Sequence, residues 1–488
     1  MGPMVAGGVR PAAVAGMFYP SDPSELRDTV AACLAGDDAA VAATPQLPAD
    51  ERADSERADR ERARRGHVGG EHHPKAVIAP HAGYRYSGPT AGAAYRALAA
   101  RRDEIERVVV VGPAHRVRLA GVGISSARAW STPLGDVEVD VAAVNDLSEL
   151  PEVVVADDAH APEHSVEVHL PFVREVFGEV PVVPLVVGAT DPAAVGRVLD
   201  SLWGGPETAI VISSDLSHYL DDASARRRDR RTSNAIVEVR PADIGPHDAC
   251  GFLPIGGLLT AALPRGLAPR PLALTTSADT AGDPSRVVGY GSFALFPPPE
   301  VGEEDARWLA GLAARAIDHE LRTGRPFPLS DAGLRIPEAV RCPGTSFVTL
   351  ERGTELLGCI GSLDVRRALW RDVARNARGA AFEDPRFPPL APTEPDGVSV
   401  EVSVLSPLEP LPVASGEELV ATLEPGVDGL VVAAGDQRGT FLPDVWEKIP
   451  EPAAFVRELV RKAGWTEPWP TGARAWRYTT TTAETTLP

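Results

Sequence analysis

The chain has 488 residues, of which 44% are hydrophobic and 24% charged, a composition typical of globular proteins. A chain of this length is too long to form a single hydrophobic core. Its formal net charge of −20 argues against nucleic acid as the main partner, because a phosphate backbone requires a basic face. No apolar run reaches the roughly 18 residues of a membrane span, and Arg10 and Pro11 interrupt the place of a signal sequence. We therefore expect a cytoplasmic protein of two domains.

The N-terminal region begins with a predicted helix and continues into a polar segment. Residues 23–34 are expected to be helical, with Ser21 or Asp22 as the N-cap. Residues 44–74 change to interleaved acidic and basic residues with alanine and show no apolar period. A salt-bridged helical rod is the alternative, but it would have no apolar face to pack. We interpret this segment as a mobile surface insertion.

From Lys75 to Phe296, short apolar runs alternate with helical patterns. The expected strands lie near residues 75–80, 107–112, 153–156, 180–187, 208–213, 270–276 and 287–296. The expected helices lie near 88–101, 138–148, 165–177, 191–203, 222–239 and 254–263. Such alternation predicts an α/β domain with a largely parallel or mixed central sheet covered by helices.

A run of prolines from Pro297 to Pro299 marks the boundary between the two predicted domains. We assign 1–297 to the first domain, 298–302 to a linker, 303–478 to a smaller α+β domain and 479–488 to a flexible, threonine-rich tail. In the second domain we expect helices near 303–322, 363–382 and 451–463. A hairpin over 345–362 and strands near 397–406 and 427–435 complete it.

Three predicted strands lead directly into a histidine: His81, His115 and His218. A single histidine after a strand is more often a structural residue. Three histidines at equivalent strand ends favour a functional site instead, because the carboxyl ends of parallel strands open onto one crevice where ligands bind. Imidazole is both a common metal ligand and a proton-transfer group near neutral pH. The pattern therefore predicts one metal or acid–base site.

Other polar residues near these strands have two open interpretations each. Asp215 either orients an imidazole or caps a helix. Cys250 precedes a predicted helix start, which would lower the pKa of its thiol, or is a small buried hydrophobe. The segment 160–169 contains His164, Glu163 and Glu167, and the two acids share a helical face. They are either outer-shell residues of the site or a solvated face.

The second domain offers one weaker candidate site. Gly358 and Gly361 flank Cys359 and Ile360 at a strand end, where they permit close approach of a ligand to the backbone. A sharp bend with a buried cysteine explains the pattern equally well. Arg386, in a turn segment, either meets an anion or forms a salt bridge within its loop. The four cysteines form no closely spaced pair and are expected to be reduced.

Six ordered motifs of the first domain resemble those of the Memo family: Arg10–Pro20, Ala79–Tyr84, Gly112–His115, Glu163–Pro171, Ser213–His218 and Cys250–Gly256. Three motifs of the second domain resemble the AMMECR family: Leu357–Gly361, Asp384–Pro389 and Thr440–Val445. The two families occur as AmmeMemoRadiSam system proteins B and A, here fused in one chain. The resemblance implies a Memo-type fold related to the LigB-like class III extradiol dioxygenases.

By this resemblance His81 and His115 match the two histidine iron ligands and His218 matches the catalytic acid–base, with Asp215 orienting or tuning it. Cys250 stands where the dioxygenases place a glutamate ligand. The replacement of glutamate by cysteine makes the set of metal ligands softer, so that it suits copper or zinc as well as iron. Leu357 stands where the AMMECR family usually has an arginine, so any anion contact of that arginine is missing.

The resemblance implies a metal-binding redox or dioxygenase-related protein that acts on a small organic substrate with a radical-SAM partner. Two other classes of function stay open. One is a non-catalytic binding or scaffold protein for a radical-SAM enzyme or a peptide. The other is a zinc-dependent hydrolase, because three ligands and an open position suffice to activate water.

Overall fold

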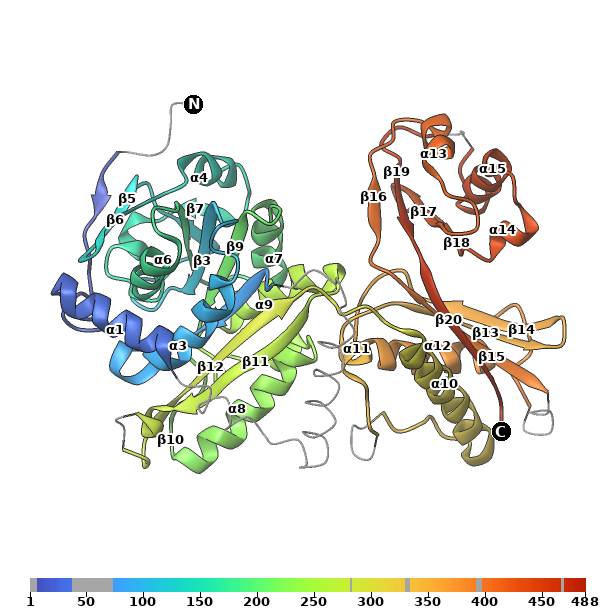
Figure 1. The fold of residues 1–488 in the computed structure, drawn as a ribbon, viewed down its shortest axis with the longest axis horizontal. Coiled ribbons are helices and arrows are strands. Elements are labelled where there is room, and N and C mark those ends of the chain that lie inside the picture. Colours follow the sequence, from blue (N-terminus) through green and yellow to red (C-terminus); the bar gives the residue numbers. More distant parts are fainter. Residues whose placement is uncertain (1–6, 37–72, 281–282, 330–333, 392–396, 467–468) are drawn as a thin grey trace. The chain divides into compact units, whose positions relative to one another are not determined.

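The computed structural model describes residues 7–36, 73–280, 283–329, 334–391, 397–466 and 469–488 (Figure 1). The chain forms two compact units, Met1–Pro297 and Pro298–Pro488. All but the last two residues of the predicted insertion 44–74 lie outside the described residues. Within the described part of the chain, no helix combines the length and the apolarity that crossing a bilayer would require.

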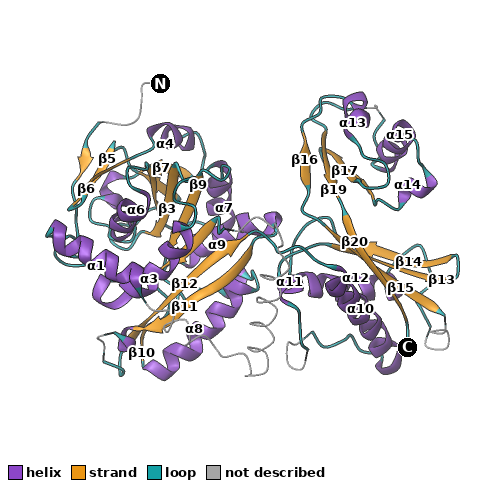
Figure 2. Ribbon diagram, in the orientation of Figure 1, coloured by secondary structure: helices purple, strands orange, loops and turns teal. Residues whose placement is uncertain are grey.

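A nine-stranded mixed sheet forms the centre of the first unit (Figure 2). Its strand order is β10-β12-β2-β9-β3-β8-β4-β7, and β11 pairs with β12. The bounds are β2 Ala76–Ala79, β3 Arg107–Pro113, β4 Val122–Ile124, β7 Val153–Val155, β8 Val182–Val187, β9 Thr208–Ser213, β10 His218–Leu220, β11 Ala268–Thr276 and β12 Val287–Phe296.

The central strands β2, β9, β3 and β8 run parallel to one another. Almost every residue in them is buried, as expected for parallel strands that are covered on both faces. Strand β12 runs antiparallel to β2 at the edge of this parallel set. The carboxyl ends of β2, β9 and β3 therefore lie side by side.

Helices cover this sheet and build its core. Among them, α3 packs on β2 and β12, whereas α9 packs on β3 and β9. The helices of this unit are α1 Pro23–Ala35, α3 Tyr84–Ala99, α4 Val141–Leu147, α5 Asp157–His160, α6 Leu170–Phe177, α7 Pro192–Ser201, α8 Asp222–Val237 and α9 Phe252–Ala262. Asp22 caps α1, as predicted, and accepts the backbone N–H groups of Ser24 and Glu25.

The elements that the sequence analysis missed in this unit are short. They include helix α5, the strands β4 and β10, and the strands of a small sheet, β1 Val9–Arg10, β5 Ala129–Thr132 and β6 Gly135–Glu138. Strands of two to four residues carry too few positions for an alternating pattern to be recognised. The expected mixed sheet with flanking helices is confirmed.

The second unit contains two four-stranded sheets, ordered β14-β13-β15-β20 and β16-β19-β17-β18. The strands are β13 Ser346–Arg352, β14 Glu355–Gly361, β15 Val398–Leu405, β16 Glu409–Leu411, β17 Gly429–Ala434, β18 Gln437–Phe441, β19 Arg474–Tyr478 and β20 Thr480–Thr486. The helices are α10 Glu303–Thr323, α11 Glu338–Arg341, α12 Leu369–Phe382, α13 Gly416–Thr422, α14 Val445–Lys448 and α15 Pro452–Lys462. Helices α10 and α12 pack on the first sheet.

The prediction of a flexible tail over 479–488 is wrong. Residues Thr480–Thr486 form β20, which pairs antiparallel with β15 along its whole length and contacts α10. Threonine is β-branched and favours extended backbone on a pleated, half-buried surface. The polar composition suggested a frayed end, but the partner strand lies about eighty residues earlier in the chain and could not be read from the tail itself.

Candidate metal centre

Two of the three strand-exit histidines meet at the carboxyl edge of the sheet. His81 follows β2 and His115 follows β3, and β9 is the single strand between them. Their ring centroids are 5.1 Å apart in an edge-to-face arrangement. The parallel order of the strands thus brings together two imidazoles that are 34 residues apart in sequence.

A third imidazole, His164, completes the cluster. Its ring centroid lies 4.9 Å from that of His115 and 5.4 Å from that of His81. One nitrogen from each of the three rings lies within 4.8 Å of the others. The sequence leaves His164 open between an outer-shell residue and a solvated face, whereas the structure places it among the potential ligands. Its segment has no regular element that could have fixed its direction in advance.

Glu163 orients two of these rings. Its Oε1 lies 3.0 Å from His115 Nδ1 and 3.1 Å from His164 Nδ1, and its Oε2 accepts the backbone N–H of His115. Burial opposes ionisation, but the hydrogen bond from His115 and the close approach of His164 outweigh it and hold the pKa of Glu163 well below its usual range. An ionised carboxylate only accepts hydrogen bonds, so His115 Nδ1 carries the proton and Nε2 keeps its lone pair.

Ser213 fixes the tautomer of His81 in the same way. The Ser213 hydroxyl donates to the backbone oxygen of Ser165 at 2.5 Å and lies 2.6 Å from His81 Nδ1. Since that hydroxyl has one proton and has already donated it, His81 Nδ1 must be the donor. Its Nε2 therefore has a free lone pair, which faces the Cys250 sulfur at 3.4 Å.

Cys250 lies in this cluster, but a helix start does not activate its thiol. Helix α9 does begin two residues later, at Phe252. Burial, aided by the nearby Asp215 carboxylate, nevertheless raises the pKa of Cys250 to about 12. The helix N-terminus is therefore too weak to offset desolvation, and of the two interpretations of Cys250 the lowered thiol pKa is not the one observed. A bound cation would be needed to hold the thiolate.

Asp215 interacts more directly with His81 than with His218. Its Oδ1 accepts the backbone N–H of His81 at 2.8 Å, and its Oδ2 lies 3.9 Å from His81 Nε2. Burial raises the pKa of Asp215, while the His81 hydrogen bond and the nearby His218 oppose the rise. His218 is half-buried, and its Nδ1 donates to the backbone oxygen of Leu216. Asp215 caps no helix, because β10 follows it.

Glu167 is not an outer-shell residue of the imidazole cluster. Its fully buried carboxylate pairs with Arg10 at 2.7 Å and accepts the Tyr19 hydroxyl and the backbone N–H groups of Ala13 and Val14. This hydrogen-bond network anchors the N-terminal segment, whose Phe18 ring lies 4.6 Å from the ring of His164. Glu167 therefore supports the site at a distance, through the chain that packs on it.

Comparisons with known proteins show the family of the chain. The family model described as Memo-like protein matches residues 10–294, which include the three imidazoles and Cys250. The chain belongs to the Memo family. Its Memo domain is 32% identical over 297 residues to a MEMO1 family protein of Sulfolobus acidocaldarius. The aligned region covers 58% of this chain and 97% of that protein.

Further matches extend this assignment. A MEMO1 family protein of Thermotoga petrophila is 31% identical over 298 residues, covering 59% of this chain and 99% of that protein. The AMMECR1 family model matches residues 310–483. A solved structure of an uncharacterized protein from Pyrococcus horikoshii has 31% sequence identity and a TM-score of 0.35, covering 38% of this chain and 93% of that protein. The two family models together show a Memo domain and an AMMECR1 domain in one chain.

In the AMMECR1 domain, Cys359 and Arg386 contact each other. Arg386 Nη2 donates to the backbone oxygen of Cys359 at 2.6 Å, and the guanidinium also pairs with Asp384. Of the two interpretations of Arg386, the salt bridge within its own loop is the one observed. Cys359 is half-buried rather than enclosed.

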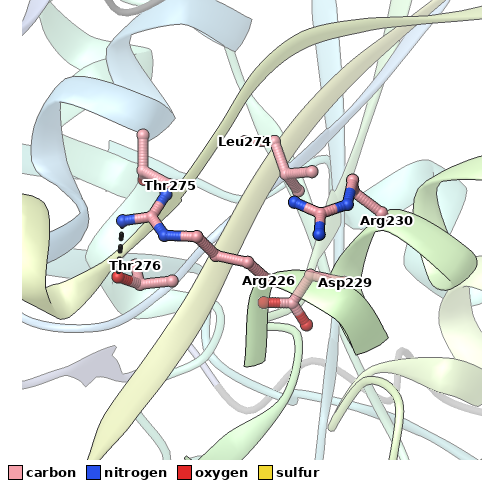
Figure 3. A pocket seen from close by; sticks show the side chains of 6 residues that line it. All are labelled: Arg226, Asp229, Arg230, Leu274, Thr275 and Thr276. Atoms are coloured by element: carbon pink, nitrogen blue, oxygen red, sulfur yellow. Dashed lines mark hydrogen bonds between the residues drawn. The ribbon is translucent and has the colours of Figure 1, made fainter. Parts of the chain in front are cut away.

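A very small cavity of about 20 Å³ lies in the Memo domain beside helix α8 (Figure 3). Asp229 lines it and is 1% exposed. Its Oδ1 accepts the backbone N–H of Ser217, next to His218, whereas its Oδ2 has no hydrogen-bond partner among the described residues. Burial raises the pKa of Asp229 to about 6, although the hydrogen bond from Ser217 favours the charged form.

We expect Asp229→Asn to stabilise the protein above pH 6. In the native state the carboxyl keeps its proton up to about pH 6, whereas the unfolded chain loses it near pH 4. Wild-type stability therefore falls as the pH rises from about 4 to 6. Asparagine keeps the acceptor for Ser217 without a charge, so the variant should gain about 1–2 kcal/mol at pH 8. Urea unfolding at pH 4 and pH 8 measures this gain.

The exposed Asp146 of α4 supplies the control. Asp146→Asn should change the free energy of unfolding little at either pH, because its carboxylate is not buried. A loss of stability of Asp229→Asn at pH 8 would contradict the assignment of a buried, destabilising charge.

Proposed function

We propose that the Memo domain binds one divalent transition metal through His81, His115 and Cys250, with His164 as a competing or additional ligand. The observation that carries this proposal is the fixed tautomers. Glu163 and Ser213 occupy the Nδ1 atoms of His115 and His81, so both Nε2 lone pairs are available. One nitrogen from each of His81, His115 and His164 lies within 4.8 Å of the others, and His81 Nε2 lies 3.4 Å from Cys250 Sγ, so these donor atoms gather around one point.

The donor set indicates the kind of metal and chemistry. Imidazole with a thiolate suits iron, copper or zinc better than hard cations such as magnesium. Such a metal, when bound, would supply Lewis-acid or redox chemistry to a small organic substrate. Asp215 is buried with a raised pKa and lies within electrostatic range of His218. We assign proton transfer to His218, with Asp215 tuning its charge.

One observation favours a second candidate. The three imidazoles His81, His115 and His164 form an all-nitrogen set, which is typical of hydrolytic zinc sites. Recruitment of the Cys250 thiolate would favour a redox metal, and recruitment of His164 would favour a zinc hydrolase. The ligand that completes the set therefore distinguishes the two functions.

The fusion of the two domains supports the proposal that both act on the same target. Covalent linkage raises the effective concentration of one domain beside the other. We propose that both domains serve the radical-SAM protein of the same system, either as enzymes on its substrate or as its scaffold. Loss of that partner's activity on truncation of the chain to residues 1–297, with metal binding retained, would support this joint role.

Glu163→Gln tests the metal site without removing a ligand. Both imidazole Nδ1 atoms face Oε1 and the backbone N–H of His115 donates to Oε2, so a glutamine NH₂ group in either position meets a donor and weakens the hold on His115. We expect the affinity for zinc, measured by competition with a chromogenic chelator, to fall about 10–100-fold. Glu149→Gln, at an exposed carboxylate of the same domain, should bind as the wild type does. Equal affinity of both variants would contradict the proposed site.

A further inference from the structure

An open cavity of about 420 Å³ lies in the Memo domain, at the edge of the sheet opposite the imidazole cluster. His73 and Lys75, which line it, precede β2, and the loop 203–206, which forms another wall, precedes β9. The cavity therefore lies at the amino ends of the parallel strands, whereas His81 and His115 follow their carboxyl ends. Its volume lies within the range of small-molecule sites. A molecule bound here would not touch the metal centre.

The Lys75 side chain brings a positive charge to this cavity without a counter-charge. Lys75 is 9% exposed, and its Nζ donates to the backbone oxygens of Gly205 and Thr208, both at 2.7 Å. Within the described part of the chain it forms no ion pair with a carboxylate, and its third N–H has no acceptor. Buried charges are nearly always paired with an opposite charge. An anion bound in the cavity would supply the missing one.

A second buried cation fixes the wall of the cavity. Arg101 lines it and is 6% exposed. Its Nη1 donates to the backbone oxygen of Pro74 at 3.0 Å, and its Nη2 donates to that of Pro206. Its ion pair with Glu104 is long, at 3.4 Å, and Glu104 is exposed. Because Arg101 and Lys75 both hold the loop 203–206, the cavity is formed before a ligand binds, which lowers the entropic cost of binding.

Trp203 gives the cavity an apolar wall beside this charge. Its ring is half-buried and lines the cavity together with the buried Leu267. Lys75 Nζ lies 5.8 Å from the centroid of the indole ring, and the guanidinium carbon of Arg265 lies 4.1 Å from it. An indole offers a flat apolar surface on which another ring can stack. The lining therefore suits a ligand that has a planar body and a negative charge.

The electrostatic surroundings of Lys75 favour an anion over a cation. Burial and then the charge of Arg101 lower the pKa of Lys75 to about 8. The charges of Arg107 and Arg265 add to this fall, and the Glu207 carboxylate opposes it. A bound anion would stabilise the ammonium and raise this pKa. Anion binding should therefore take up protons near pH 8 and weaken as the pH rises above 8.

We propose that this cavity is a binding site for a small aromatic anion, a planar ring that carries a carboxylate or a phosphate group. The anionic group pairs with the Lys75 ammonium and accepts its third N–H, and the ring packs on Trp203. The site is separate from the metal centre, so it stands or falls independently of the function proposed above.

Isothermal titration calorimetry of the full chain with phenyl phosphate and with benzoate tests this proposal. We expect at least one of them to bind at one site per chain with a Kd below about 1 mM, and the one that binds more tightly identifies the anionic group. Benzyl alcohol, which has the ring without the charge, should bind at least about tenfold more weakly. Failure of both anions to bind, or equal binding of benzyl alcohol, would overturn the proposal.

Lys75→Met should lower the affinity for the bound anion at least about tenfold and abolish its decline between pH 8 and pH 10. Arg102→Met is the matched control, because Arg102 is an exposed cation beside Arg101 that does not line the cavity. Its affinity should equal that of the wild type. An equal loss in both variants would show that the overall field of the domain, and not this site, attracts the anion.

Trp203→Phe places the ligand even if Lys75→Met fails to fold. Anion binding should change the tryptophan fluorescence of the wild type, because the ring packs on Trp203. Phenylalanine keeps a ring for stacking, so Trp203→Phe should still bind the anion by calorimetry but lose this fluorescence change. A fluorescence change that persists in Trp203→Phe would place the anion elsewhere and overturn the proposal.

Discussion

Arg10→Met is expected to lower the free energy of unfolding of the Memo domain by about 3–5 kcal/mol. The Arg10 guanidinium pairs with Glu167 at 2.7 Å, and both side chains are almost fully buried. It also donates to the backbone oxygens of His160 and Glu163 and stacks on Trp130. Methionine fills a similar volume but leaves the Glu167 charge buried without its cation. Urea unfolding of the full chain, followed by circular dichroism, measures the loss.

Arg27→Met provides the comparison. Arg27 forms an exposed ion pair with Glu175 at 3.4 Å, and such pairs contribute about 0–1 kcal/mol. The double variant Arg10→Met with Glu167→Gln should recover part of the stability, because the uncompensated charge is gone. A loss in Arg10→Met no larger than that in Arg27→Met would show that the buried pair does not anchor the N-terminal segment.

The second large effect is expected on metal binding. His81→Ala and His115→Ala should each reduce zinc affinity by more than about 100-fold, which exceeds the range expected for an outer-shell partner. Each variant removes one of the two imidazoles whose Nε2 atoms are held ready by fixed tautomers. Competition with a chromogenic chelator, on protein purified without added metal, gives the affinities.

His247→Ala controls for the loss of any histidine from this domain. His247 is exposed, and Arg228 donates a hydrogen bond to its backbone oxygen. The variant His247→Ala should bind zinc with the affinity of the wild type. Equal affinity in His81→Ala and His247→Ala would show that the strand-exit histidines are structural.

The meeting of His81 and His115 could be predicted because it follows from local rules. Each residue ends a run of β-branched residues, and parallel strands place such ends on one edge. His164 could not be placed in the same way, because its direction depends on Glu163 and on contact with Phe18 from the N-terminal segment. No periodic pattern encodes contacts of that kind.

The pKa of the Cys250 thiol is a second property that could not be predicted from the sequence. A helix start is visible in sequence, and it lowers a thiol pKa by a modest amount. How deeply the sulfur is buried, and that Asp215 lies beside it, depends on segments 35 residues apart in sequence. Desolvation then decides the sign of the shift. The strand β20 is a similar case, because its order comes from pairing with β15.

X-ray absorption at the metal edge of the loaded full chain tests the metal centre most directly. We predict a first shell of imidazole nitrogens at about 2.0–2.1 Å with one sulfur at about 2.3 Å. The sulfur contribution should disappear in Cys250→Ser and persist in Cys33→Ser, where the buried cysteine lies in α1. A shell without sulfur that Cys250→Ser leaves unchanged would contradict the assigned ligand set, and a chain that takes up no metal would contradict the site itself.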